Sequence, residues 1–325
     1  MSATAPAMIL VVTLNPALDV THHVAGAEWA GVNRPHEVAV RPGGKGVNVA
    51  RTLRALDTEV LITGLAGGPA GDAIAAGLAA AGLAADFTAT AGETRRTFAV
   101  VDTRRGQTGL FNEPGPLVSA TEYEHFRARY RSALAGSAAV VLSGSLPPGV
   151  PAAAYAELAQ LAGAAGVPTV LDADGPALML GATGGPAIVK PNLEELERAV
   201  GRPLRRPGCT DPDPDAVVRA AGELITAGAG AVVVSLGPAG LLAVTSEGIW
   251  QAAPPGPAPG NPTGAGDAAV AGLAHSLMHG HGWPDRLRHA TALGTAAVAE
   301  PVAGEVSPGR YRELLAGISV ARRGT

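Results

Sequence analysis

The polar residues best suited to chemistry stand where a glycine-rich turn runs into helical sequence. One such stretch reads Asn-Pro-Thr-Gly-Ala-Gly-Asp over residues 261–267 and continues into Ala-, Val- and Leu-rich sequence. At the start of a helix the backbone N–H groups are free, and the positive end of the helix favours an anion. Asp267 can accept a proton there, although an acidic residue in a first turn also stabilises a helix without any catalytic role. The stretch predicts an anion site beside a general base, with an ordinary helix start as the alternative.

A second glycine-rich junction reads Arg-Pro-Gly-Gly-Lys-Gly-Val-Asn-Val-Ala over residues 41–50. It is not a Walker phosphate-binding loop, because Gly46 follows Lys45 where that motif has Ser or Thr, and the motif occurs nowhere else in the chain. Residues 264–269 fit the dinucleotide pattern G-x-G-x-x-A, but that pattern follows a strand, and the Pro- and Gly-rich stretch 254–262 cannot form one. Any bound nucleotide is therefore held in another way.

The elements that must position these junctions follow from the hydrophobic pattern, which predicts an α/β fold with a mostly parallel sheet covered by helices. Short apolar runs predict strands at 9–13, 60–64, 138–143, 169–172, 187–190 and 231–235. Helices are predicted at 47–55, 72–81, 121–134, 152–165, 193–200 and 215–227, with another from Gly266 onward. Polar residues at 190–195 and 235–240 directly follow two of these strands. The carboxyl ends of strands are where open α/β sheets bind ligands.

Two further stretches, 19–40 and 95–111, alternate in the manner of antiparallel strands, with turn signals at 25–26 and 104–106. They flank the first helical units, so we expect them to form a small β-sheet that projects from the main one. No internal repeat or interdomain linker is evident. The 325 residues are expected to form a single domain with this discontinuous projection.

Composition limits the partners. The formal net charge is −4, charged residues make up 16% of the chain, and no long basic run occurs, which argues against a nucleic-acid or membrane partner. Cys209 is the only cysteine, which suits a reducing compartment. The apolar run from Ala7 to Val12 lacks a positive flank and is too short to span a bilayer, so it is interpreted as the first buried strand. We expect a cytoplasmic protein.

Six motifs, taken in order, resemble those of one family. They are Thr-Leu-Asn-Pro-Ala-Leu-Asp at 13–19, the glycine-rich junction at 43–50, Ser-Gly-Ser-Leu-Pro-Pro-Gly at 143–149, Lys-Pro-Asn-Leu-Glu-Glu-Leu at 190–196, Ser-Leu-Gly-Pro-Ala-Gly at 235–240 and Gly-Ala-Gly-Asp at 264–267. The set is similar to the PfkB, ribokinase-like carbohydrate kinases, and within them to 1-phosphofructokinases and tagatose-6-phosphate kinases. The resemblance runs from about Ile9 to about Ala316. It implies a ribokinase-like three-layer α/β/α fold whose small projecting β-sheet acts as a lid.

The resemblance also implies roles for individual residues. Asp267 would deprotonate a sugar hydroxyl that attacks the γ-phosphate of ATP, and the N–H groups of Gly264, Ala265 and Gly266 would form an anion hole. Sugar binding is carried over to Asp19, Gly43, Gly44, Lys45, Asn48 and Arg95. ATP binding is carried over to Lys190, Asn192, Glu195, Ser235, Gly237, Gly240 and Ala292. Asn192 and Glu195 would also place Mg²⁺, mostly through water. A homodimer through the lid is implied as well.

One departure from the family pattern concerns the phosphate that the sugar already carries. Close relatives have basic groups near positions 32 and 110, where this chain has Val32 and Leu110, while Arg95 is retained. Arg34, Lys45 and Arg96 are the candidates to compensate. The sequence favours a phosphorylated ketohexose and leaves an unphosphorylated hexose or amino sugar as the alternative. A non-catalytic sugar-binding or nucleotide-binding protein is disfavoured because Asp267 and its glycines are intact, and a dehydrogenase because no strand precedes Gly264.

Overall fold

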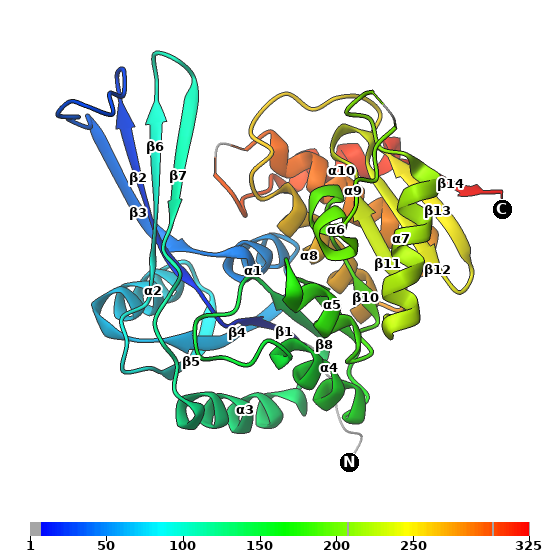
Figure 1. Cartoon of the computed structure of the whole chain (residues 1–325), viewed down its shortest axis with the longest axis horizontal. Helices are drawn as coiled ribbons and strands as arrows, with labels where there is room; N and C mark the ends of the chain where they lie inside the picture. Colours follow the sequence, from blue (N-terminus) through cyan, green and yellow to red (C-terminus); the bar gives the residue numbers. More distant parts are fainter. Residues whose placement is uncertain (1–7, 207, 301, 325) are drawn as a thin grey trace.

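The fold is built on one large sheet with a smaller sheet projecting from it, as the computed structural model in Figure 1 shows. The structure describes residues 8–206, 208–300 and 302–324, so Ala7, the first residue of the apolar N-terminal run, lies outside them. The large sheet has ten strands in the order β14-β13-β12-β11-β10-β9-β8-β1-β4-β5. None of the described helices is both long and apolar enough to span a membrane.

The strands of the large sheet are β1 (Met8–Thr13), β4 (Glu59–Ala66), β5 (Ala84–Ala89), β8 (Ser137–Ser143), β9 (Thr169–Asp172), β10 (Ile188–Val189), β11 (Val232–Ser235), β12 (Leu241–Thr245), β13 (Gly248–Ala253) and β14 (Ser319–Arg323). The helices are α1 (Lys45–Ala55), α2 (Gly68–Ala80), α3 (Ala120–Leu134), α4 (Ala154–Ala164), α5 (Pro176–Ala182), α6 (Leu193–Val200), α7 (Pro214–Ala227), α8 (Ala265–Met278), α9 (Trp283–Val298) and α10 (Pro308–Gly317). A short 3₁₀ turn spans Gly237–Ala239.

Helices cover both faces of the large sheet, which confirms the expected three layers. Alternate residues of β1 show why: Ile9 and Val11 pack into a core with α1, α2, α8, α9 and α10, whereas Leu10 and Val12 pack into a second core with α3 to α7. All four side chains are fully buried. Strands buried on both faces are continuously apolar, which explains the Val-Val-Val run in β11.

The projecting sheet consists of β2 (Ala17–Val24), β3 (Glu37–Gly43), β6 (Arg96–Asp102) and β7 (Gln107–Asn112), in the order β3-β2-β6-β7. The two segments expected to project from the main sheet therefore do so. Each stretch forms an antiparallel hairpin, as expected, and the two hairpins join through a parallel pairing of β2 with β6. A parallel pair needs no local turn, so alternation within each segment could not reveal it.

Candidate active site

The candidate site lies at the carboxyl ends of the central strands. From β1 the chain proceeds outward through β4 and β5, and then returns to β8 on the other side of β1. Such a reversal of strand order leaves a crevice where α/β sheets bind ligands. Beyond the strand ends lies a cavity of about 640 Å³, within the usual range for small-molecule sites. Its lining includes Lys45, Lys190, Asn192, Glu195, Ser235, Gly237, Gly240, Ala265, Gly266 and Asp267, all of them predicted site residues.

Asp267 stands in the first turn of α8, as the sequence predicts. The N-cap of this helix is Gly264, in a left-handed conformation (φ 87°), and no side chain caps the helix. A Cβ at Gly264 would lie 2.9 Å from the Cβ of Ala303, so this turn needs glycine. The Ala265 N–H donates to the carbonyl of Pro262 (3.1 Å). Because this bond occupies the Ala265 N–H, the amides of Gly264, Ala265 and Gly266 can form an anion hole together only if the turn opens and the bond to Pro262 breaks.

Asp267 is tied to the other glycine-rich junction. Its Oδ2 accepts a hydrogen bond from Nδ2 of Asn48 (2.8 Å), across 219 residues of sequence. The pKa of Asp267 is raised to about 7, chiefly because the carboxyl is buried and secondly because the charge of Asp172 is close. Lys45, the Asn48 hydrogen bond and Lys190 oppose the rise. A carboxyl with this pKa is poised to take up a proton near neutral pH.

A network of charges lies beside Asp267 in the cavity. Lys190 and Asp172, whose side chains are 2% and 1% exposed, form an ion pair (3.3 Å). Lys45 joins them through Asp172 Oδ2 (3.4 Å) and Glu195 Oε1 (2.9 Å). Burial would lower the pKa of Lys45, but Asp172, Glu195 and Asp267 outweigh it and the pKa is raised. Lys45, predicted to bind sugar, is thus placed in the cavity among the predicted nucleotide-binding residues.

The predicted nucleotide-binding residues lie together with one exception. Lys190, Asn192, Glu195, Ser235, Gly237 and Gly240 line the cavity, whereas Ala292 does not. The side chain of Ala292 is fully buried in the core. The same helix, α9, turns Thr291, Gly294, Thr295 and Val298 to the cavity instead. Helix α9 therefore borders the cavity, but Ala292 lies on its core-facing side.

The predicted sugar-binding residues lie around the base of the projecting sheet. Asp19 on β2 packs against Gly43 so closely that a Cβ on Gly43 would lie 1.9 Å from Asp19 Oδ2. Gly44, at φ 98°, caps α1 and leads to Asn48 one turn later. Arg95 donates through Nε to the Asn15 carbonyl (3.1 Å). Burial raises the pKa of Asp19, and the charges of Arg41, Arg95 and Arg51 oppose this rise.

Magnesium fits the cavity only with ligands from outside the chain. Glu195 already accepts from Lys45 and from the Asn192 N–H (2.8 Å), and Asn192 Oδ1 accepts from the Glu195 N–H (2.7 Å). Across the described residues, no group of three or more His, Cys, Asp or Glu side chains is arranged to hold a metal ion. Mg²⁺ commonly keeps several waters and binds substrate phosphates together with one or two carboxylates. The donors present fit that mode, with water between the ion and Glu195.

Sequence reasoning missed three charged residues that the fold brings to the site. Asp172 ends β9, and its position after a predicted strand is the same signal that identified Lys190 and Ser235. Arg41 opens the second glycine-rich junction and Arg51 lies on the helix that follows it. Arg41 belongs to that junction motif, but the motif does not show where its side chain points; the places of both arginines depend on strand register and helix phase.

Comparisons with known proteins agree with this fold. A family model described as pfkB family carbohydrate kinase matches residues 12–309. The tetrameric inhibited form of phosphofructokinase-2 from Escherichia coli is 30% identical, with a TM-score of 0.87 over 95% of this chain and 98% of that one. A "possible 1-phosphofructokinase" from Thermotoga maritima is 28% identical, with a TM-score of 0.84 over 98% and 100%. Ribokinase from Arabidopsis thaliana, complexed with ribose and ATP, is 21% identical (TM-score 0.75, 96% and 99%) and supports the fold alone.

Proposed function

Because the chain belongs to the pfkB family of carbohydrate kinases, we propose that it transfers the γ-phosphate of ATP to a hydroxyl of a phosphorylated ketohexose. Fructose 1-phosphate, tagatose 6-phosphate and fructose 6-phosphate are the candidate substrates. The observation that carries the proposal is the buried Asp267, held by Asn48 at the start of α8 beside a cavity lined with lysines. The phosphofructokinase-2 of Escherichia coli has been solved with fructose-6-phosphate, which favours a phosphosugar.

In the proposed mechanism Asp267 takes the proton of the attacking hydroxyl, since its carboxyl lies at the end of the cavity nearest the sugar-binding residues. Asn48 orients the carboxylate. Lys45 and Lys190 would offset the charge of the transferring phosphoryl group, and the amides at the start of α8 would receive its oxygens. Mg²⁺ bound with ATP would neutralise phosphate charge, with Glu195 and Asn192 holding its waters. Asp19 would bind hydroxyl groups of the sugar, and Arg95 would bind the phosphate that the sugar already carries.

An ADP-release assay with a substrate panel tests this function. The panel holds the three ketohexose phosphates, fructose, tagatose and ribose, each with ATP and Mg²⁺. We expect the highest kcat/KM with one of the phosphates. Turnover of an unphosphorylated sugar alone would instead support the alternative suggested by the uncharged Val32 and Leu110. Absence of turnover with every sugar, together with tight sugar binding, would make the protein a binding module.

We also propose that the projecting sheet is a lid and the contact surface of a homodimer in the cytoplasm. The face of the sheet opposite Asp19 carries Val20, Val40, Phe98 and Phe111 side by side in register. Val40 is 56% exposed, and the exposed Trp29 packs edge-on against Phe111 (5.7 Å). An exposed apolar face of this kind marks an interaction surface, and a second copy presents a matching one.

Val40→Asp should therefore convert the protein to a monomer, as measured by light scattering coupled to size-exclusion chromatography. Leu180→Asp is the matched control, because Leu180 is also exposed (38%) but belongs to α5, a helix that lies away from the projecting sheet in Figure 1. A monomeric wild type, or a Val40→Asp variant of unchanged mass, contradicts the proposal.

A further inference from the structure

Strand register places an arginine directly opposite the proposed sugar-binding carboxylate. Asp19 on β2 pairs with Arg41 on β3 in the antiparallel ladder, and with Thr97 on β6 on its other side. Directly opposed residues of antiparallel strands project from the same face, with Cβ atoms about 5 Å apart. Arg41, Asp19 and Thr97 therefore form one row on the face of the projecting sheet opposite its apolar side.

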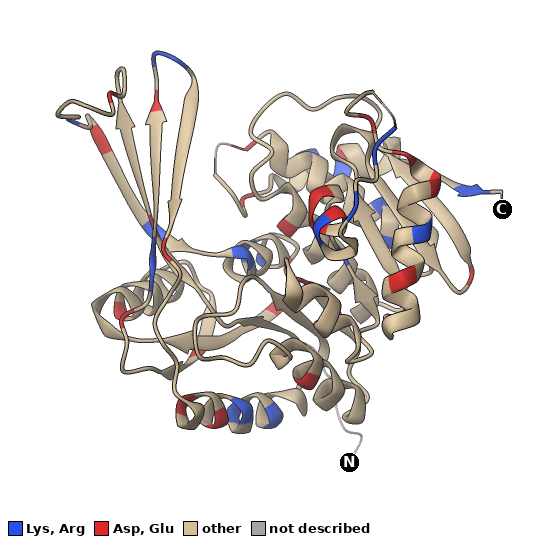
Figure 2. Ribbon diagram, in the orientation of Figure 1, with Lys and Arg blue, Asp and Glu red and all other residues tan. Residues whose placement is uncertain are grey.

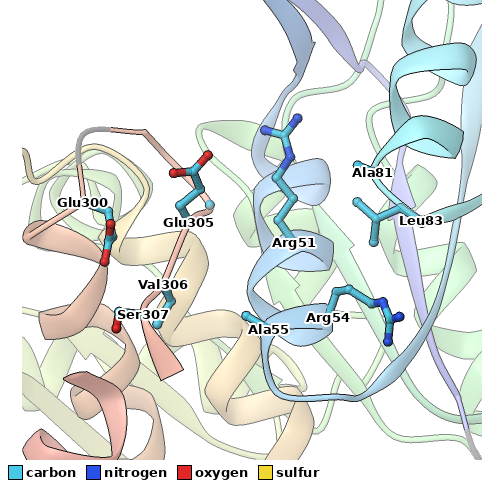
Figure 3. A pocket seen from close by; sticks show the side chains of 10 residues that line it. Arg51, Arg54, Ala55, Ala81, Leu83, Glu300, Glu305, Val306 and Ser307 are labelled. Carbon is cyan, nitrogen blue, oxygen red and sulfur yellow. The ribbon is translucent and has the colours of Figure 1, made fainter. Parts of the chain in front are cut away.

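A second arginine reaches the same place from α1. Arg51 lies one helical turn after Asn48, on the same side of α1. Asn48 is the residue that donates a hydrogen bond to Asp267. Its Nη2 donates to the carbonyl of Pro42, next to Arg41 (2.9 Å), which uses one of the five N–H donors of the guanidinium. Arg51 and Arg54 line a second cavity, between α1 and residues 304–307. Figure 3 shows the two arginines leaving α1 in different directions, with Glu305 across this cavity from Arg51.

The basic residues expected to replace the missing charges at positions 32 and 110 are placed elsewhere. Lys45 is paired with Asp172 and Glu195 in the cavity. Arg96 forms an ion pair with Glu93 (3.0 Å). In the sheet it stands opposite Leu18, the residue before Asp19, so the Arg96 side chain projects from the other face of the sheet. Arg34 is exposed in the connection between β2 and β3. Figure 2 shows other basic residues, in blue, at the foot of the projecting sheet and on α1.

We propose that Arg41 and Arg51, together with Arg95, bind the phosphate that the substrate already carries and so select a phosphosugar over its unphosphorylated counterpart. The inference rests on the proposed kinase function. Arg41 stands directly opposite Asp19 in the ladder, and the charges of Arg41, Arg95 and Arg51 all act on this carboxylate. Glu305 acts in turn on Arg51, and Glu113 acts on Arg95. The fork of a guanidinium matches a phosphate by paired hydrogen bonds, which a lysine cannot reproduce. The arrangement extends from Asp267 through Asn48 to Arg51 and Arg41, with the reacting hydroxyl at one end and the phosphate at the other.

The test compares Arg41→Gln and Arg51→Gln with Arg54→Gln, a matched control on the same helix. Kinetics are measured with fructose 6-phosphate and with fructose, and binding of both is measured by calorimetry. We expect each of the first two variants to lower kcat/KM and affinity for fructose 6-phosphate by about tenfold to a hundredfold, as for loss of a charged hydrogen bond. Fructose kinetics, the KM for ATP and the melting temperature should stay near wild type, and Arg54→Gln should change neither sugar.

Three results would overturn the inference: unchanged fructose 6-phosphate affinity in both variants, an equal loss for both sugars, or the same loss in Arg54→Gln. If the protein is not a kinase, the same measurements give a result that differs from these three. A wild type that binds fructose 6-phosphate without releasing ADP refutes the kinase proposal, while the calorimetry still decides whether the arginines recognise the phosphate. Arg51→Lys separates charge from geometry, because it keeps the charge but cannot form the fork, and we expect it to recover only part of the affinity.

Discussion

Asp267→Asn is expected to lower kcat by about 10²–10⁴-fold while the dissociation constants of ATP and the sugar stay nearly unchanged, because the amide keeps the shape but cannot accept the proton. Single-turnover measurement of ADP formation gives the chemical step directly. Asp285→Asn is the matched control, since Asp285 also stands in the first turn of a helix, α9, but is exposed. A purely helix-stabilising aspartate contributes about 0.3–1 kcal/mol and no catalysis. Retention of more than half of the wild-type kcat would remove Asp267 from the role of base.

The pH dependence of the wild type provides an independent check on the same residue. The pKa of Asp267 is raised to about 7, mainly by burial and then by the charge of Asp172. A general base works only when deprotonated, so kcat/KM should fall about tenfold per pH unit below about pH 7 and level off above it. The acidic limb should be absent from the residual activity of Asp267→Asn.

Lys190→Met is expected to lower the free energy of unfolding by about 1.5–3 kcal/mol, because the buried Asp172 loses one of its two lysine partners and keeps only Lys45. Urea-induced unfolding measures this loss. The same change removes a positive charge from the cavity wall, so the dissociation constant of ATP, measured by calorimetry, should rise at least tenfold.

The double variant Lys190→Met/Asp172→Asn separates the two effects of Lys190. In the double variant no buried carboxylate is left with reduced cationic pairing, so part of the unfolding free energy should return. The introduced amide could still bond to the Ser143 hydroxyl, which donates to Asp172 in the wild type (3.3 Å). ATP affinity should stay low, because the cation is still missing. If the double variant is no more stable than Lys190→Met, or the single variant loses less than about 1 kcal/mol, the buried pair does not have the importance assigned to it.

How far the sequence predicts the fold depends on whether an element carries its own boundaries. Helix α6 was predicted to the residue, because Asn192 and Glu195 form a capping box at its start and Gly201, in the left-handed region, ends it. The antiparallel edge of strands β12 to β14 was missed. Its outer strand, Ser319–Arg323, is partly exposed and polar, and it pairs with β13, which lies far back in the sequence. Nothing local to that strand marks it, because its stability comes from the partner.

For the site residues too, what the sequence can predict depends on whether local sequence fixes their position. The structure brings Asp267 and Asn48 together, because each glycine-rich motif fixes a turn at the start of a helix. Ala292 lies in the core and not at the cavity, because a predicted helix carries no rotational phase; α9 begins at Trp283, and its N-cap Gly282 has no side chain that would mark the start. The position of Arg41 depends on the register between β2 and β3, and that of Arg51 depends on how closely α1 approaches β3. Neither can be deduced from a single stretch of sequence.

The hydrogen bond between Asn48 and Asp267 joins segments 219 residues apart. A ribosome therefore synthesises every residue proposed to bind the sugar, up to Arg95, long before it supplies the proposed base. A nascent chain that has released β6 but not α8 would carry these residues without Asp267, and so could not carry out the proposed reaction. The order of synthesis would thus delay that reaction until α8 has docked beside α1.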